Sequence, residues 1–117
     1  MRRFKFSYDE ENDDLFLYNP KSKGGVELGD IVLDFNNKKE LVGLQMMNAS
    51  RFLKEIMGES ISRIRSVLMD LRECKVGVKV KGNLLIIKVY LFSRIKELSP
   101  VISVPNIRKT SPALAYT

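Results

Sequence analysis

Apolar side chains recur at every second position near the amino end of the chain, a period typical of half-buried β-strands. Phe4, Phe6 and Tyr8 alternate with polar residues, and Leu15–Tyr18 is a second candidate strand that is apolar at every position. We predict a loop over Asn19–Gly25, because proline, serine and two glycines interrupt both regular patterns. Two further runs, on either side of a polar turn, place these apolar side chains on one face: Ile31, Leu33, Phe35, Val42, Leu44 and Met46. Four consecutive strands with short polar turns predict an antiparallel meander whose hydrophobic face must be covered.

Helical spacing follows these strands. Ser50 is expected to be the N-cap of a short helix, and Ser60 that of a second helix beyond Gly58, because a serine hydroxyl accepts a hydrogen bond from the first helical turn. The apolar positions of the two helices are Phe52, Leu53 and Ile56, then Ile61, Ile64, Leu68 and Leu71. One bent helix running through Gly58 is the alternative. In either form the apolar stripe is expected to pack against the hydrophobic face of the strands.

Two alternating runs flank Gly82-Asn83, and glycine followed by asparagine between such runs predicts a β-hairpin with a two-residue turn of type II′. The turn length sets the pairs of the apolar face: Val80 with Leu85, Val78 with Ile87 and Val76 with Val89. The reverse face then carries Lys75, Lys79, Lys81 and Lys88 with Ile86 and Tyr90.

The chain beyond the hairpin has weaker patterns. Ser93–Leu98 is expected to be irregular or a short helical turn, and Val101–Val104 a last edge strand that Pro105 stops. Ile107–Thr117 has too little periodicity for an assignment and is expected to be mobile or to dock on a partner.

These elements fit one domain, because 117 residues suffice for a single modest core but not for two. We predict an α+β fold with a four-stranded antiparallel meander and one or two helices. A C-terminal β-hairpin that extends or faces the first sheet and an irregular tail complete it. Residues 1–57 would form the meander and a helix, residues 58–98 a helix and the hairpin, and residues 99–117 an extended tail.

Positive charge is concentrated in the second half of the chain. The net charge is +6. Residues 1–57 hold 9 Lys and Arg against 10 Asp and Glu, whereas residues 58–117 hold 11 against 4. This asymmetry is compatible with a basic contact surface for nucleic acid or for an acidic partner. A lysine-rich face that only keeps the protein solvated is the alternative, since composition does not establish clustering on one face.

The residues that most often carry catalysis are missing. The chain has no histidine and one cysteine, Cys74, which excludes the usual general base, a Ser-His-Asp triad and a thiolate zinc site. Neither glycine-rich nucleotide-binding pattern occurs, since Lys21–Gly25 has lysines and glycines without the required spacing. We therefore expect a protein that is not an enzyme and that binds no cofactor.

We expect neither a membrane span nor a signal peptide in this chain. It has no run of about 18 apolar residues, and its amino end, MRRFKFSYDE, lacks the apolar region and cleavage site of a signal peptide. A single cysteine fits a reducing compartment, and Cys74 itself is expected to be a small buried hydrophobe. We expect a cytoplasmic location and no membrane partner.

Three blocks of sequence, YDEENDDLFLY, VELGDIVLDF and ELVGLQMMNAS, together resemble the domain-of-unknown-function 2283 family of small uncharacterised prokaryotic proteins. The matching positions are Tyr8, Asp9, Glu11, Asp13, Leu15, Asp30, Leu33, Asp34, Val42, Gly43, Leu44, Asn48, Ala49 and Ser50. Phe16 and Leu17 depart from the usual aromatic-aliphatic pair. Lys39 stands where a turn glycine is common, which leaves the type of that turn open. The resemblance covers about the first half of the chain and implies a small α+β domain in a prokaryotic cytoplasm. It implies no established activity, and some family members are suspected partners of toxin-like proteins.

The acidic turn Asp9–Asp14 is a candidate site for a hard divalent cation such as calcium or magnesium. Its oxygen ligands would come from Asp9, Glu11, Asp13 and Asp14, with Asp30 and Asp34 approaching across the sheet. The EF-hand pattern fails, because the sixth position from Asp9 is Asp14 instead of glycine and the twelfth is Pro20 instead of glutamate. A solvated hairpin turn with local side-chain to backbone hydrogen bonds is the alternative.

The basic hairpin is the stronger functional candidate. A phosphate-contacting patch would consist of Lys75, Lys79, Lys81, Lys88, Arg63 and Arg65, with Tyr90 offering a ring for base stacking. Sheets that bind RNA usually present several aromatic side chains, whereas only one is expected on this face.

We therefore expect a non-enzymatic binding module for a protein partner or for a second copy of the chain. Exposed sheet edges and an apolar tail favour such pairing. Nucleic-acid binding through the second half and cation binding at the acidic turn are the two alternatives.

Overall fold

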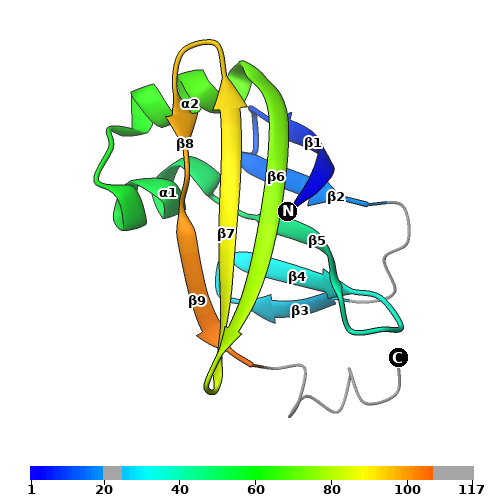
Figure 1. The fold of residues 1–117 in the computed structure, drawn as a ribbon. Coiled ribbons are helices and arrows are strands. Elements are labelled where there is room, and N and C mark those ends of the chain that lie inside the picture. Colours follow the sequence, from blue (N-terminus) through cyan, green and yellow to red (C-terminus); the bar gives the residue numbers. More distant parts are fainter. Residues whose placement is uncertain (20–24, 107–117) are drawn as a thin grey trace.

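The computed structural model describes residues 1–19 and 25–106 and, within them, shows an α+β fold (Figure 1). Two helices and a mostly antiparallel sheet are present, which confirms the predicted fold class. The elements in chain order are β1 (Arg2–Asp9), β2 (Asp14–Tyr18), β3 (Gly25–Leu28), β4 (Ile31–Phe35), β5 (Leu41–Met46), α1 (Ala49–Met57), α2 (Ile61–Met69), β6 (Leu71–Lys81), β7 (Leu84–Ser93), β8 (Glu97–Leu98) and β9 (Val101–Pro105). The expectation for Ile107–Thr117 concerns residues outside this description. In the described part, no helix is long and apolar enough to cross a membrane.

The strand order differs from the predicted meander. The order is β3-β4-β5-β2-β1-β6-β7-β8, with β9 pairing β7 as well, so β5 lies between β4 and β2. The prediction of four consecutive neighbouring strands is therefore wrong. The sequence prediction also left out β3, which pairs with β4 across Gly29-Asp30. Gly29 has a φ of 65°, a conformation that glycine adopts easily.

Strand β1 joins the two parts of the sheet. Its second half, Lys5–Asp9, pairs with β2, whereas Arg2–Phe4 pairs with Cys74–Val76 of β6. The strands β6 and β7 cross in front of β1–β5 in Figure 1. The β6–β7 hairpin thus both extends the first sheet through β1 and turns its apolar face toward that sheet.

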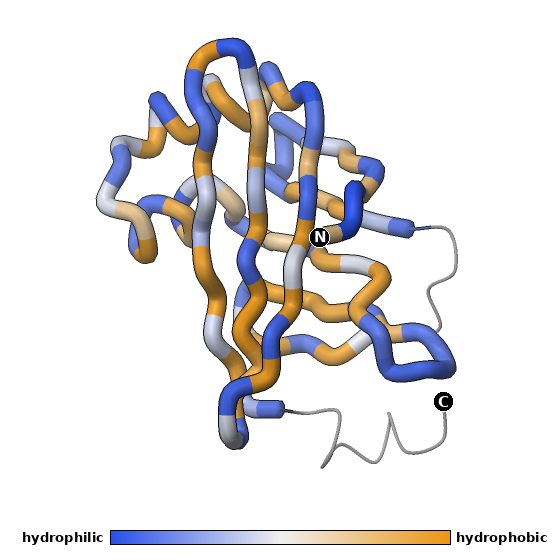
Figure 2. Tube along the Cα trace, viewed as in Figure 1, coloured by the Kyte–Doolittle hydropathy of each residue, from blue (hydrophilic) through white to orange (hydrophobic). Residues whose placement is uncertain are grey.

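One hydrophobic core lies between these faces. It combines side chains from the first sheet, both helices and the hairpin, including Leu33, Leu44, Leu53, Ile64, Leu85, Ile87 and Leu91. Figure 2 shows hydrophobic residues along β4, β5 and β7, while hydrophilic residues gather at turns such as that between β4 and β5. Because burial of apolar surface is the dominant stabilising term, this core holds both halves of the chain together.

The two helices are separate, because Gly58 ends α1 with a φ of 73°. Ser60 caps α2 by accepting a hydrogen bond from the N–H of Arg63 at 3.3 Å. Three positions of the predicted apolar stripe are not in the helical core. Ile56 lies in α1 and is 44% exposed. Ile61 begins α2 and is 37% exposed, and Leu71 is already in β6 because α2 ends at Met69.

Candidate functional site

The lysines predicted for the reverse face of the hairpin do lie on that face. Lys75 is directly opposite Tyr90 across the β6–β7 ladder. The ammonium of Lys88 lies 5.2 Å from the centroid of the Tyr90 ring, and that of Lys75 lies 5.9 Å from the centroid of Phe92. The two rings are stacked with centroids 6.2 Å apart. Lysine ammonium groups and aromatic rings thus form one column on the outer face, held by cation–π contacts.

Phe92 is a member of this column that the sequence analysis missed. Its position two residues beyond Tyr90 on the same strand was the available signal, because alternate residues of a strand share a face.

The two arginines predicted for the same patch lie elsewhere. The guanidinium of Arg65 donates to the carbonyl of Glu10 at 2.8 Å and lies 3.8 Å from Asp13. Its helix, α2, packs on the core side of β7, since Ile64 and Leu91 belong to the same buried cluster. Arg63 is on that helix too. The structure therefore separates Arg63 and Arg65 from the four lysines and Tyr90.

The acidic turn is organised by hydrogen bonds within the protein. The carboxylate of Asp9 accepts from the backbone N–H groups of Glu11 and Asn12 at 3.1 and 3.2 Å, and from the Asn12 amide at 2.8 Å. These bonds lower the pKa of Asp9 below its ordinary value. Glu11 is exposed, and Asp14 is the first residue of β2. No group of three or more acidic or cysteine side chains in the described residues is arranged to hold a metal ion. The four predicted ligands are therefore not brought together as a cation site.

Asp13 instead caps helix α1. Its carboxylate accepts from the hydroxyl of Ser50 at 2.6 Å and from the Ser50 N–H at 3.1 Å, and its carbonyl accepts from the N–H of Ala49 at 2.8 Å. The prediction that Ser50 is the N-cap is wrong, because Asn48 occupies that position and makes no side-chain cap bond. A carboxylate from a distant turn satisfies the exposed N–H groups that a local cap would normally serve.

Tyr8 completes this cluster by donating its hydroxyl to Asp13 at 2.5 Å. Partial burial and this hydrogen bond raise the pKa of Tyr8 well above its ordinary value. The Asp13 cluster is therefore a structural link between the β1–β2 turn and α1.

Strand β6 has an unpaired stretch at its carboxyl end. The β1 ladder stops at the pair of Arg2 with Val76, whereas β6 continues to Lys81. Gly77–Lys81 pairs with β7 on one side and with no strand of the described residues on the other. We refer to Gly77–Lys81 as the β6 edge. Val78 and Val80 are 41% and 45% exposed, although their partners Ile87 and Leu85 are fully buried.

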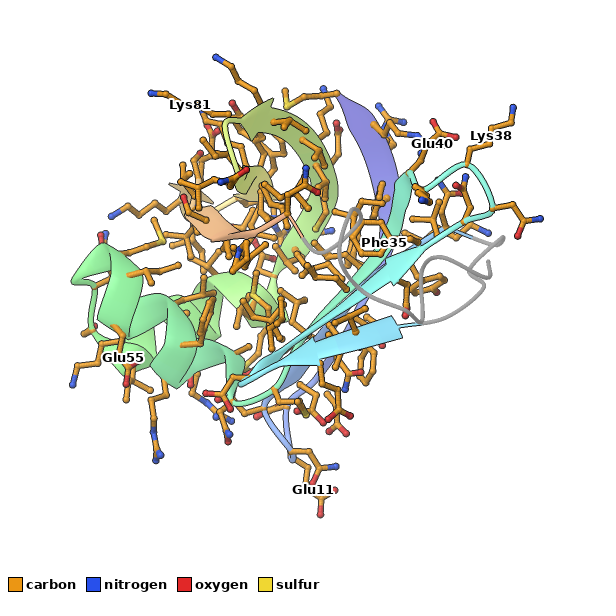
Figure 3. The ribbon with its side chains drawn as sticks, turned by 90° about the horizontal axis from the view of Figure 1, so that it is seen from below. Glu11, Phe35, Lys38, Glu40, Glu55 and Lys81 are labelled. Carbon is orange, nitrogen blue, oxygen red and sulfur yellow. The ribbon has the colours of Figure 1, made fainter. Side chains whose placement is uncertain are left out.

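An open groove borders the β6 edge. It has a volume of about 420 Å³ and is lined by Met1, Arg2, Phe4, Glu40, Leu41, Val76, Gly77 and Val78. Phe4, Leu41 and Val76 are buried and form an apolar floor, while Arg2 and Glu40 add charge. Lys81 on the hairpin and Glu40 on the β4–β5 turn are labelled in Figure 3. The groove was not predicted, because it depends on the register of the β1–β6 ladder, which places Arg2 opposite Val76.

Comparison with known proteins assigns the first half of this structure to a family. The family model described as protein of unknown function (DUF2283) matches residues 5–50. An uncharacterized protein of Methanocaldococcus jannaschii, MJ0789, is 32% identical over 100 residues, which cover 82% of this chain and 80% of that protein. The chain belongs to the DUF2283 family. No solved structure matches it.

The segment matched by DUF2283 runs from the β1–β2 hairpin to the start of α1. Asp13, Asn48, Ala49 and Ser50, which resembled the family pattern, are the residues that join the turn to the helix. These DUF2283 positions therefore have a structural role. The β6 edge and the aromatic-lysine column lie outside the matched segment.

Proposed function

We propose that the protein is a non-enzymatic binding module that accepts a strand from a protein partner, or from a second copy of itself, along the β6 edge. The observation that carries this proposal is that Gly77–Lys81 pairs on one side only among the described residues, and that Gly77 and Val78 line a groove with an apolar floor. An added strand would form main-chain hydrogen bonds with the edge, and its alternate side chains would enter the groove.

The exposed valines support this mode of binding. Val78 and Val80 belong by strand alternation to the apolar face of the hairpin, yet both remain partly in water. Burial of their side chains by a partner would stabilise the complex by about 25 cal/mol for each Å² of apolar surface removed from water. A partner thus completes the ladder and covers the apolar face in a single step.

Three other edges in the described residues are less suited to pairing. The Lys5–Asp9 half of β1 also pairs on one side only, but Leu68, Met69 and Leu71 line the space beside it. Strand β3 has only four residues, and β9 ends at Pro105, which has no N–H group to donate. Short edge strands and edge prolines limit unwanted strand addition in natural proteins. The β6 edge has five residues and no proline, so we assign the binding role to it.

A photo-crosslinking experiment tests the proposal. A benzoyl-phenylalanine analogue replaces Val80 in one variant, and in the matched control it replaces Val101, which is 51% exposed on β9. We expect a defined adduct from position 80 alone in extracts of the source cells. Excess unlabelled wild-type protein should compete it away, whereas a Val78→Lys variant should not. Equal adducts from both positions, or no adduct from position 80, would contradict the proposal.

Nucleic-acid binding on the outer face of the hairpin is a second candidate. It is favoured by the column of Lys75, Phe92, Tyr90 and Lys88, which combines positive charge with two rings. Single-stranded nucleic acid is bound by such combinations of phosphate contacts and base stacking. Fluorescence anisotropy with a labelled single strand at low salt tests it. We expect binding that weakens steeply with added salt and with the Lys75→Gln/Lys88→Gln double substitution, whereas no binding at low salt would reject this candidate.

A further inference from the structure

We infer that the strand accepted by the β6 edge alternates acidic with apolar side chains, its acidic residues lying on the lysine face and its apolar residues on the groove face. This inference rests on the proposed function and adds the chemistry of the partner. It is drawn from the distribution of charge on the two faces of β6.

Successive side chains of the β6 edge point to opposite faces of the sheet. Val78 lines the groove, and Val80 lies on the same face of β6, opposite the buried Leu85, whereas Lys79 and Lys81 lie on the outer face. In an added strand, directly opposite residues point to the same face and have Cβ atoms about 4.5–5.5 Å apart. The partner's side chains on the outer face would therefore meet Lys79 and Lys81.

Neither of these two lysines has a carboxylate partner among the described residues, whereas other lysines of the protein do. Lys75 lies 3.3 Å from Glu73, and Lys96 pairs with Glu59. Lys88, opposite Gly77 on the neighbouring strand, adds further positive charge to the same face. A carboxylate on the partner would neutralise this charge, while a partner lysine or arginine would be repelled.

The groove face favours the opposite pattern. Its floor is formed by buried apolar side chains, and the opposite charges of Arg2 and Glu40 at its rim offset each other, so the floor favours apolar side chains of the partner. The two faces together therefore select a strand with acidic residues at alternate positions and apolar residues between them.

A second copy of the chain fits this edge poorly. When two antiparallel β6 edges keep their matching faces aligned, Lys79 and Lys81 of one copy lie opposite or diagonal to the same lysines of the other. Like charges placed in this way destabilise strand pairing. The charge of the edge thus favours a different, acidic partner.

Peptide titrations of the ¹⁵N-labelled full chain, followed by NMR, test the inference. The probes are three peptides of equal length that alternate valine with glutamate, with glutamine or with lysine. We expect the Glu/Val peptide to shift the amide signals of Gly77–Lys81 and to bind about fivefold tighter than the Gln/Val peptide at low salt, a difference that shrinks as salt is added. The double variant Lys79→Glu/Lys81→Glu should instead prefer the Lys/Val peptide. The matched control Arg51→Glu/Lys54→Glu changes the net charge equally on exposed α1 positions and should keep the wild-type preference.

The outcomes separate this inference from the proposed function. Equal binding of the Glu/Val and Gln/Val peptides at the β6 edge would overturn the acidic partner and leave strand addition standing. If no peptide shifted the amide signals of the β6 edge and position 80 gave no crosslink, both the acidic partner and strand addition itself would be rejected. A concentration-dependent dimer that Val78→Lys abolishes would identify a second copy as the occupant and would overturn the acidic partner.

Discussion

The carboxylate of Asp13 and the side chain of Ser50 are hydrogen-bonded at 2.6 Å, although 37 positions separate them in the chain. The same carboxylate accepts the backbone N–H of Ser50, so it serves the first turn of α1 in place of a local N-cap side chain. A φ of 56° at Asp13 directs the turn toward the helix. The turn, the helix start and Tyr8 therefore form one structural unit.

Substitution of Asp13 should weaken the whole fold. Asp13→Ala removes the acceptor of three hydrogen bonds, and we expect the free energy of unfolding to fall by about 2–3 kcal/mol. Asp13→Asn keeps an acceptor and tolerates the positive φ, so its loss should be smaller. Urea denaturation measures both. Glu11→Gln, on the exposed part of the same turn, is the control and should change stability by less than about 0.5 kcal/mol. An Asp13→Ala variant as stable as this control would refute the capping role.

The turn between β4 and β5 contains a residue in a glycine-type conformation. Lys39 has a φ of 62°, and it stands where the family pattern commonly has glycine. Lys39→Gly should therefore raise the free energy of unfolding by about 0.5–1 kcal/mol, because it relieves the left-handed strain of a side chain bearing a Cβ. Thermal denaturation measures the change. Lys38→Gly, one position earlier and without a positive φ, should destabilise the protein, and a gain there equal to that at position 39 would contradict the explanation.

Gly43 is required by close packing against Asp34. A Cβ at position 43 would lie 2.9 Å from Oδ2 and 3.1 Å from Cβ of Asp34, its partner on β4. Gly43→Ala should lower the free energy of unfolding by about 1–3 kcal/mol. The cost should be smaller in an Asp34→Gly background, where the neighbouring atoms are absent. A double-mutant cycle in urea measures this coupling. Additive effects of the two substitutions would show that contact with Asp34 is not the cause.

Asp70 should make the stability of the protein depend on pH. Hydrogen bonds from the Arg94 side chain at 2.8 Å and from its backbone N–H at 2.9 Å, with a further bond from Arg72, hold the pKa of Asp70 well below its ordinary range. Because the folded-state pKa is lowered, the contribution of Asp70 is fully present above its unfolded pKa and is lost as the pH falls below about 4. The stability difference between the wild type and Asp70→Asn should therefore be largest at neutral pH and shrink in acid. Urea denaturation from pH 7 down to pH 3 tests this, and a difference that stayed constant would reject it.

Periodicity in the sequence was sufficient for the local elements but not for their arrangement. The alternation of Phe4, Phe6 and Tyr8, the break at Gly58 and the turn at Gly82-Asn83 are signals between near neighbours in the chain. The strand order was missed because Gly25–Leu28 is short and begins inside the stretch predicted as a loop, and because β5 pairs with β2, a strand that is not its neighbour in the chain. Alternation indicates which face a residue occupies, and it does not indicate which strand lies beside it.

The residues of the candidate site were likewise predicted where local alternation determines their face and missed where contacts between distant parts of the chain place them. Strand alternation placed Lys79, Lys81 and Tyr90 on one face, whereas Arg65 was assigned by charge alone and lies on a different surface. Asp13 was weighed as a metal ligand because its role as a helix cap depends on a contact across 37 positions. The β6 edge arises from the register of the β1–β6 ladder, which places Arg2 opposite Val76, a relationship that no local pattern contains.

The ladder between β1 and β6 consists of Arg2–Phe4 and Cys74–Val76, and all of these residues lie outside the 5–50 segment that defines the family. The segment that the family model matches therefore stops short of this ladder, whereas the similarity to the archaeal relative covers 82% of this chain and continues past it. Because only three residue pairs join β1 to β6, a substitution in Arg2–Phe4 would change how the hairpin is attached without altering the contact between Asp13 and Ser50.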